Sequence, residues 1–145
     1  MLEKILEDHA LWFRTKGREG ERAVLRGVDF DQAVLRDACL VEADLMGARL
    51  MNADLRGADL RGANLQDADL SNALLQNANL EETDLMMTDF KGAQVKGTRF
   101  GGAYLHGADL SLAVDLTPAQ MDDIYSDETT RFPAGQGPEQ TWPGR

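Results

Sequence analysis

The sequence is poor in the residues that build most catalytic and metal centres. Its 145 residues include one cysteine, Cys39, and two histidines, His9 and His106. A single cysteine cannot form an internal disulfide, which fits a reducing compartment. No apolar run approaches the roughly 20 residues of a membrane span. The N-terminal segment MLEKILEDHALWF carries four charged residues where a secretion signal would be apolar. We therefore expect a cytoplasmic protein without a membrane segment.

Basic residues are also few. Fifteen Lys and Arg stand against 25 Asp and Glu, which gives a formal net charge of -10. Sequence-independent binding to nucleic acid or to anionic lipid needs clustered Lys and Arg. The composition therefore argues against a direct nucleic-acid or membrane partner.

Motifs of known catalytic chemistry are absent as well. The sequence has no Walker motif, no Gly-rich dinucleotide loop and no CxxC or HExxH spacing. His9 falls on the apolar side of an N-terminal helical pattern, where a hydrogen-bonded packing histidine is expected rather than a ligand. Cys39 has no second Cys or His beside it for a redox or metal role. We expect a non-enzyme with no catalytic residues, no metal and no cofactor.

What the sequence has in abundance is a period of five residues. From Leu25 to Leu110, every fifth position is apolar over eighteen consecutive units, with Leu at fourteen of them. Two residues before each stands a small residue, usually Ala. Residues two apart in an extended segment point to the same side, so these two share a face and the residue between them faces away. The next two residues, often RG or QN, are turn formers.

A chain that turns the same way every five residues winds into a solenoid whose inside is filled by the apolar positions. The period alone leaves open how many edges make one coil. The predicted core ladder includes Leu25, Leu45, Leu65, Leu85, Leu105, Ala53, Ala58 and Ala63.

The run ADLRGADLRGANL resembles the pentapeptide-repeat family, and the resemblance extends over residues 23–112. It implies an all-β solenoid, a right-handed quadrilateral β-helix with about 20 residues per coil. Eighteen units then make about 4.5 coils. Residues 20 apart would stack at one inter-strand spacing, about 4.8 Å.

The flanks are interpreted as caps, because a bare solenoid end exposes its core and its unpaired strand edges. Residues 1–22 are expected to form an N-terminal capping helix and a linker. In residues 113–145, Thr117, Pro118 and Gln120 form a capping-box pattern, which predicts a short C-terminal α-helix followed by an irregular tail. Phe132 or Trp142 is expected to anchor that tail. Both flanks are similar to those of bacterial family members.

One outward column brings three acids together: Asp69, Asp89 and Asp109. Their mutual repulsion needs an offset from backbone hydrogen bonds, counter-ions or a basic partner. Fluoroquinolone-resistance members of the family resemble rods of B-DNA and occupy the DNA site of gyrase or topoisomerase IV. This chain departs from them because its repeat is short and contains no interrupting loop.

Methionine is placed unevenly. The repeat core has none, whereas Met46, Met86 and Met87 fall at outward positions. Methionine suits adaptable contact surfaces, so these three are predicted to contact a partner or a second copy of the chain. The sequence favours a non-enzymatic protein–protein interaction module with acidic and mixed-charge faces, either a monomer or a weak homodimer. The alternative is a DNA mimic that binds gyrase or topoisomerase IV.

Overall fold

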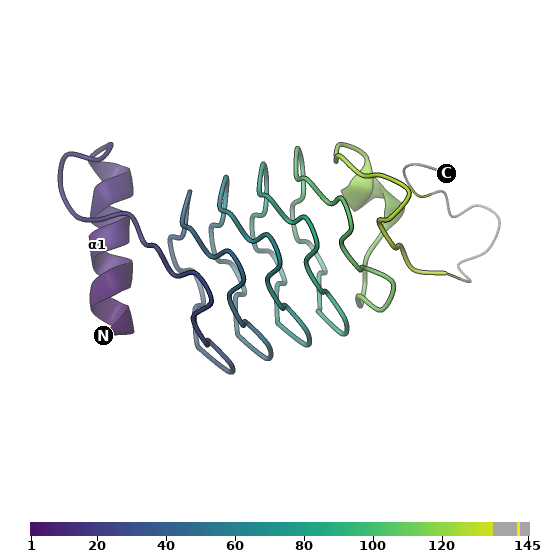
Figure 1. The fold of residues 1–145 in the computed structure, drawn as a ribbon, viewed down its shortest axis with the longest axis horizontal. Coiled ribbons are helices and arrows are strands. Elements are labelled where there is room, and N and C mark those ends of the chain that lie inside the picture. Colours follow the sequence, from purple (N-terminus) through teal and green to yellow (C-terminus); the bar gives the residue numbers. More distant parts are fainter. Residues whose placement is uncertain (135–141, 143–145) are drawn as a thin grey trace.

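The computed structural model describes residues 1–134 and Trp142. It contains one α-helix, α1 (Leu2–Arg14), followed by a long solenoid. One short 3-10 helix, η1 (Pro118–Met121), lies near the far end of the solenoid (Figure 1). None of the helices in these residues is both long enough and apolar enough to cross a membrane.

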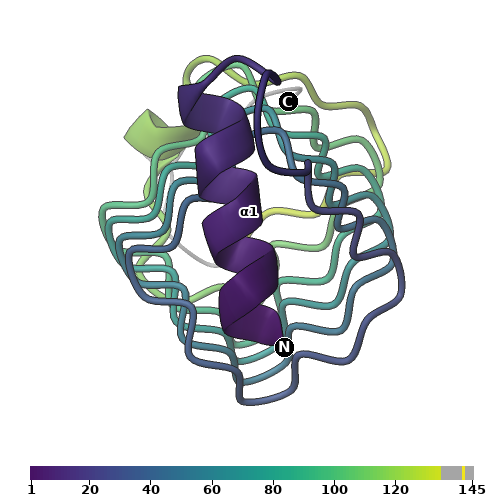
Figure 2. The same cartoon turned by 90° about the vertical axis from the view of Figure 1, so that its left-hand side faces the viewer.

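The solenoid is built from isolated parallel bridges between residues 20 apart, beginning with Val24 and Asp44. Each bridged residue stands between two-residue turns, so one coil of 20 residues has four short edges and four corners. The main chain bonds to both neighbouring coils: the Asp44 amide donates to Ala23 O at 2.9 Å, and the Leu45 amide donates to Asn64 O at 2.7 Å. Viewed from the end that α1 covers, successive coils lie over one another (Figure 2).

The inside of the coil is filled by buried apolar side chains. The eight residues of the core ladder are at most 6% exposed: Leu25, Leu45, Leu65, Leu85, Leu105, Ala53, Ala58 and Ala63. Where a Thr replaces the small Ala, its hydroxyl is also buried and needs an acceptor. Thr88 and Thr98 meet this need by donating to Leu65 O and Leu75 O, at 2.9 and 2.7 Å.

The corners require a left-handed backbone. Gly57 and Gly62 have φ near +69° and +67°, a region that glycine enters without steric cost. Other corners place a side chain there, such as Met87 at φ 61°. The repeated corner conformation keeps every turn in the same direction, and the chain therefore closes into coils.

At the first coil, α1 lies across the open end of the solenoid (Figures 1 and 2). Its one fully buried residue is His9. The Ala23 amide donates to His9 Nδ1 at 2.8 Å, so the proton of the neutral ring is on Nε2, which donates to Val41 O at 2.7 Å. The interpretation of His9 as a hydrogen-bonded packing residue is confirmed.

The prediction of a C-terminal α-helix is wrong, because η1 is a single 3-10 turn. The expected capping box is present, with the Thr117 amide donating to Gln120 Oε1 at 2.9 Å. However, Gln120 Nε2 also donates to Val95 O and Thr98 O on the last full coil, at 2.8 and 2.9 Å. These bonds hold the turn against the coil, and the chain returns to the ladder at Tyr125 instead of extending the helix.

The ladder therefore runs past residue 112. Tyr125 bridges to Tyr104, and Arg131 bridges to Asp109. Next to these rungs, the buried side chains of Phe132 and Trp142 stack with ring centroids 5.4 Å apart. The rest of the predicted irregular tail, residues 135–141 and 143–145, lies outside the described residues.

Candidate functional site

The acidic residues of the outer surface mostly serve the turns that follow them. In the column that includes Asp69, Asp89 and Asp109, each carboxylate accepts the amide N–H two residues later, at 2.9 to 3.0 Å. Ser71 adds its hydroxyl to Asp69 at 2.5 Å. Each carboxylate thus satisfies a corner amide, and this offsets the repulsion between stacked aspartates.

The last acid of this column has further partners. The Ser111 hydroxyl donates to Asp109 at 2.6 Å and, with the backbone amide of the same residue, holds the pKa of the Asp109 carboxyl below its usual range. Arg131, on the next rung, lies 3.7 Å from the same carboxylate. Asp69, Asp89 and Asp109 are thus half-buried, and each carboxylate is hydrogen-bonded within its own corner.

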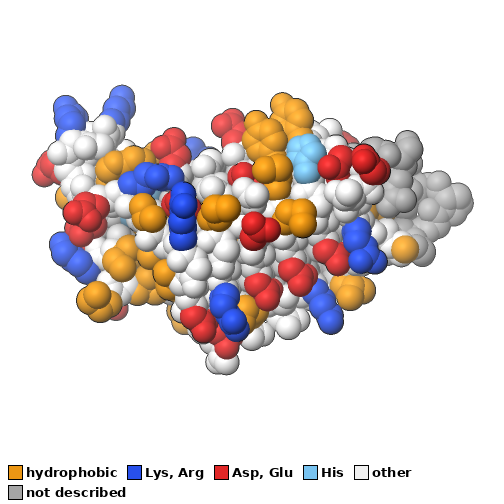
Figure 3. Space-filling view, viewed as in Figure 1, with side chains coloured by type: hydrophobic (Ala, Val, Ile, Leu, Met, Phe, Trp, Pro, Cys, Tyr) orange, Lys and Arg blue, Asp and Glu red, His pale blue; other side chains and the backbone are white. Residues whose placement is uncertain are grey.

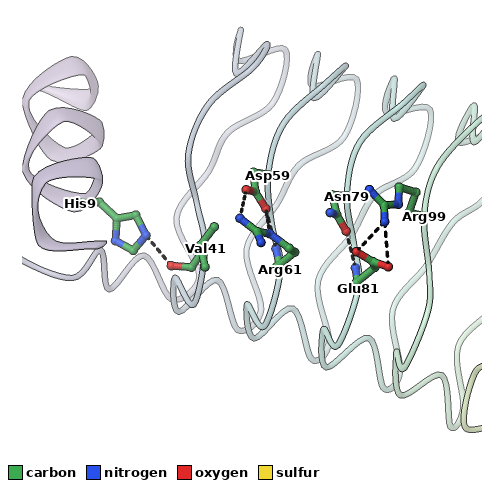
Figure 4. Close-up of polar contacts among 7 residues, drawn as sticks. All are labelled: His9, Val41, Asp59, Arg61, Asn79, Glu81 and Arg99. Carbon is green, nitrogen blue, oxygen red and sulfur yellow. Dashed lines mark hydrogen bonds and ion pairs between the residues drawn. The ribbon is translucent and has the colours of Figure 1, made fainter. Parts of the chain in front are cut away.

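A second outer face is a mosaic of ion pairs (Figure 4). Arg61 forms two bonds to Asp59, at 2.8 and 2.6 Å, and lowers the pKa of that carboxyl. On the next two rungs, Arg99 lies 3.2 Å from Glu81. Cys39, one rung before Asp59 in the same column, is a half-exposed free thiol. On this face, Arg61 and Arg99 each pair with an acidic side chain.

An open groove of about 480 Å³ follows the neighbouring corner. Three of its positions are glycines, so backbone forms part of its floor. Four acids line it against one base, and that base already binds Asp59. The lining residues are Phe13, Val41, Glu42, Arg61, Gly62, Glu81, Glu82, Gly101, Gly102 and Asp123.

The three predicted contact methionines are not equally placed. Met46 and Met86 are half-buried and stand in one column with Gln66 between them, so the structure does not bring these two side by side. Met87 is 59% exposed, and its sulfur lies where a side chain at Gly107 would be. Met86 and Met87 follow each other at one corner, whereas Met46 lies two rungs away from them.

Two tyrosines extend that methionine pair. Tyr104 and Tyr125 are 44% and 54% exposed and stack with ring centroids 4.9 Å apart and an interplanar angle of 12°. Tyr104 bridges to Asp84, two residues before Met86, so the tyrosines and methionines share one face. We call Met86, Met87, Tyr104 and Tyr125 the Met–Tyr patch. Figure 3 shows hydrophobic side chains gathered beside a histidine on the surface.

Sequence reasoning missed the tyrosines of this patch. Tyr104 occupies an outward position where most units carry Asp or Asn, so its signal was present in the repeat. Tyr125 follows the break in the five-residue register, and no spacing linked it to Tyr104.

No cluster of three or more His, Cys, Asp or Glu side chains in residues 1–134 is arranged to hold a metal ion. His9 is held by the first coil, while His106 lies at the other end of the molecule with its Nδ1 buried and unbonded. Among the described residues, we take the Met–Tyr patch and the acidic groove as the candidate binding features.

Comparison with solved structures gives proteins of the same architecture. Alr5209, a pentapeptide repeat protein from Nostoc PCC 7120, is 26% identical with a TM-score of 0.62, over 92% of this chain and 88% of that chain. HetL, a pentapeptide repeat protein involved in heterocyst differentiation regulation in the same cyanobacterium, is 25% identical with a TM-score of 0.58. That likeness covers 81% of this chain and 55% of HetL.

QnrB1, a plasmid-mediated fluoroquinolone resistance protein, is 22% identical with a TM-score of 0.56 over 78% of this chain and 70% of its own. At that identity it shows the fold alone. A comparison with curated proteins gives no match. The family model for pentapeptide repeats matches residues 21–52, 53–92, 63–102 and 88–121. The chain therefore belongs to the pentapeptide-repeat family.

Proposed function

We propose that this chain is a non-enzymatic interaction module that binds another protein through the Met–Tyr patch. The observation that carries the proposal is the exposure of two stacked tyrosines beside Met87 on a face held by the backbone ladder. Aromatic residues and methionine are enriched at protein interfaces. Tyrosine offers a rigid contact area at low entropic cost, and methionine adapts its shape to a partner. The cytoplasm is the expected compartment.

The acidic groove indicates that the partner carries positive charge. Glu82 and Asp84 lie on either side of Thr83, so the groove and the Met–Tyr patch border the same face of the coil. A partner that covers both would place apolar side chains on the patch and Lys or Arg over the groove. Met46 and the column of Asp69, Asp89 and Asp109 remain further proposed contacts.

The test is capture of partners from the source cell with a double variant of the patch, Met87→Glu with Tyr125→Glu. The matched control is Val24→Glu with Val34→Glu, because these exposed apolar side chains lie outside the patch at 61% and 73% exposure. We expect a protein captured by the wild type and by the control to be lost with the patch variant, while melting of both variants stays near that of the wild type. Equal capture by both variants would refute the patch.

A gyrase supercoiling assay, with and without a fluoroquinolone, separates this proposal from the DNA-mimic alternative. A DNA mimic needs a surface of free negative charge that can replace phosphates. Asp69, Asp89 and Asp109 are instead hydrogen-bonded to their own corner amides, and the opposite face of the coil carries Arg61 and Arg99. The interaction module predicts unchanged supercoiling, whereas inhibition or protection from the drug would favour the DNA mimic.

A further inference from the structure

We propose that His9 is a proton-sensitive latch, which holds α1 over the first coil at neutral pH and releases it on mild acidification. The proposal rests on the position of the ring at the seam between α1 and the coil (Figure 4). It concerns the end of the molecule away from the Met–Tyr patch and does not depend on the proposed partner.

The ring of His9 joins α1 to two separate segments of the first coil. Its Nδ1 accepts the Ala23 amide at 2.8 Å, where the coil begins, and its Nε2 donates to Val41 O at 2.7 Å, where the first turn of the coil is completed. Within residues 1–134, no other hydrogen bond or ion pair links α1 to the coil from Ala23 onward. The direct hydrogen bonds between α1 and the coil are therefore those of one imidazole. The linker adds the Glu21 amide, which donates to Asp8 O at 3.2 Å, and Arg22 Nε, which donates to Glu42 O at 2.7 Å.

Only the neutral ring can make both bonds. Protonation converts Nδ1 from an acceptor into a donor that faces the Ala23 N–H, and two donors repel each other. The imidazolium would also be a buried charge without a carboxylate bonded to it. Both effects oppose the seated position of α1 once the ring is charged.

The charged groups around the ring set the direction of the pH response. Burial lowers the pKa of His9, the Val41 carbonyl raises it, Arg22 lowers it and Glu42 raises it, with a net lowering. A ring with a lowered pKa in the seated state favours that state fully above the ordinary value of about 6.5. This preference is lost as the pH falls below that value, until the seated ring is itself protonated.

The remaining attachment of α1 is apolar and incomplete. Leu2, Ile5 and Leu6 pack against the core but stay only partly buried. Release of the helix would uncover Leu25 and the unpaired edge of the first coil. The latch would thus control access to one end of the solenoid.

Trp12 provides a local reporter, because its ring stacks on His9 with centroids 5.4 Å apart. The fluorescence of Trp12 is recorded from pH 7.5 to pH 5 in a Trp142→Phe background, alongside hydrogen exchange of the Ala23 amide. We expect the hydrogen-exchange protection of the Ala23 amide to be lost as the pH falls, while the amide of Leu65 in the middle coil stays protected. The ring nitrogens of His9, followed by NMR, should show the Nε2–H tautomer at pH 7.5.

His9→Gln removes the titrating group while its amide can still donate to Val41 O. The matched control is His106→Gln, which removes the other histidine of the chain. We expect the acid response to disappear in His9→Gln and to persist in His106→Gln. An equal response in both variants would overturn the latch. The latch would also be overturned if the His9 ring of the wild type became protonated without any change in exchange at Ala23. This second test needs no variant, so it can be made even if His9→Gln does not fold.

Discussion

The two ends of the solenoid solve the same problem by different means. At the N-terminal end, a separate element, α1, lies across the first coil and is bonded to it through one side chain, His9. At the C-terminal end, the backbone itself continues the ladder through Tyr125 and Arg131, and Gln120 holds the intervening turn to the last full coil. The first coil is covered by a separate helix, whereas the last full coil is covered by further rungs of the same ladder.

This difference predicts different local stabilities. A rung that belongs to the continuous ladder opens only when its neighbours do, whereas an element held by a few side-chain contacts opens locally. The Met–Tyr patch lies at the continuous end, because Tyr125 is part of the added rungs. The proposed recognition surface therefore lies at the end where the chain continues the ladder, and the proposed releasable cover lies at the opposite end.

Removal of residues 1–16 should have the largest effect, because it changes the state of assembly. The truncated chain keeps its coils but exposes the edge of the first one, and unpaired edges associate. We expect oligomers in sedimentation experiments, with the coil still folded by circular dichroism. A truncated chain that stays monomeric and melts like the full chain would show that α1 covers nothing essential.

Core truncations at the two ends should differ in cost. Leu105→Ala opens a cavity beneath the continuous rungs and is expected to lower the free energy of unfolding by about 2–5 kcal/mol. Leu25→Ala removes an equal volume next to α1, where the cover can settle into the gap, and should fall at the lower end of that range. Urea denaturation measures both. A larger loss at Leu25 would reverse the ranking of the two ends.

Gln120→Ala tests the turn that leads into the added rungs. The side chain makes three bonds to backbone groups, and its loss leaves the Val95 and Thr98 carbonyls without this donor. We expect a loss of about 1–3 kcal/mol in the free energy of unfolding. Gln66→Ala is the control, since the side chain of Gln66 makes no hydrogen bond in the described structure, and it should stay within about 0.5 kcal/mol. Equal losses in the two variants would mean that the hydrogen bonds of Gln120 do not stabilise this turn.

Much of the coil could be predicted because the pattern that determines it is contained within each five-residue unit. The inward pair and the corner are both local, so the register from Leu25 to Leu110 could be followed unit by unit. The bonds of His9 could not be predicted in this way. Val41 is 32 residues away, and its carbonyl becomes a partner only when the helix lies across the coil.

The C-terminal rungs were missed because extra residues break the register. Tyr104 pairs with Tyr125, and Asp109 pairs with Arg131, at spacings greater than 20. A signal was nevertheless present, because Thr130, Arg131 and Phe132 repeat the order of residues 98–100. In both places the buried Thr hydroxyl donates to a carbonyl of the coil before it.

Acid should affect α1 and the body of the coil in separate pH ranges, and this is the smallest of the expected effects. The carboxyls of Asp54 and Asp59 have lowered pKa values because Arg56 and Arg61 bond to them. Their contribution to stability is present above the ordinary aspartate pKa of about 3.9 and is lost as the pH falls below it. Thermal melts should therefore report weakening of the coil only below about pH 4, whereas Trp12 should respond to acid already below about pH 6.5. A single transition shared by both signals would contradict this separation.

Residue-resolved hydrogen exchange at pH 7.5 tests the difference between the two ends most directly. The account predicts that the amides of Tyr125 and Arg131 exchange as slowly as that of Leu65, because all three belong to one continuous ladder. The Ala23 amide should exchange much faster, by local release of α1. The account would be contradicted if Ala23 were as protected as Leu65, or if Tyr125 and Arg131 exchanged as fast as Ala23.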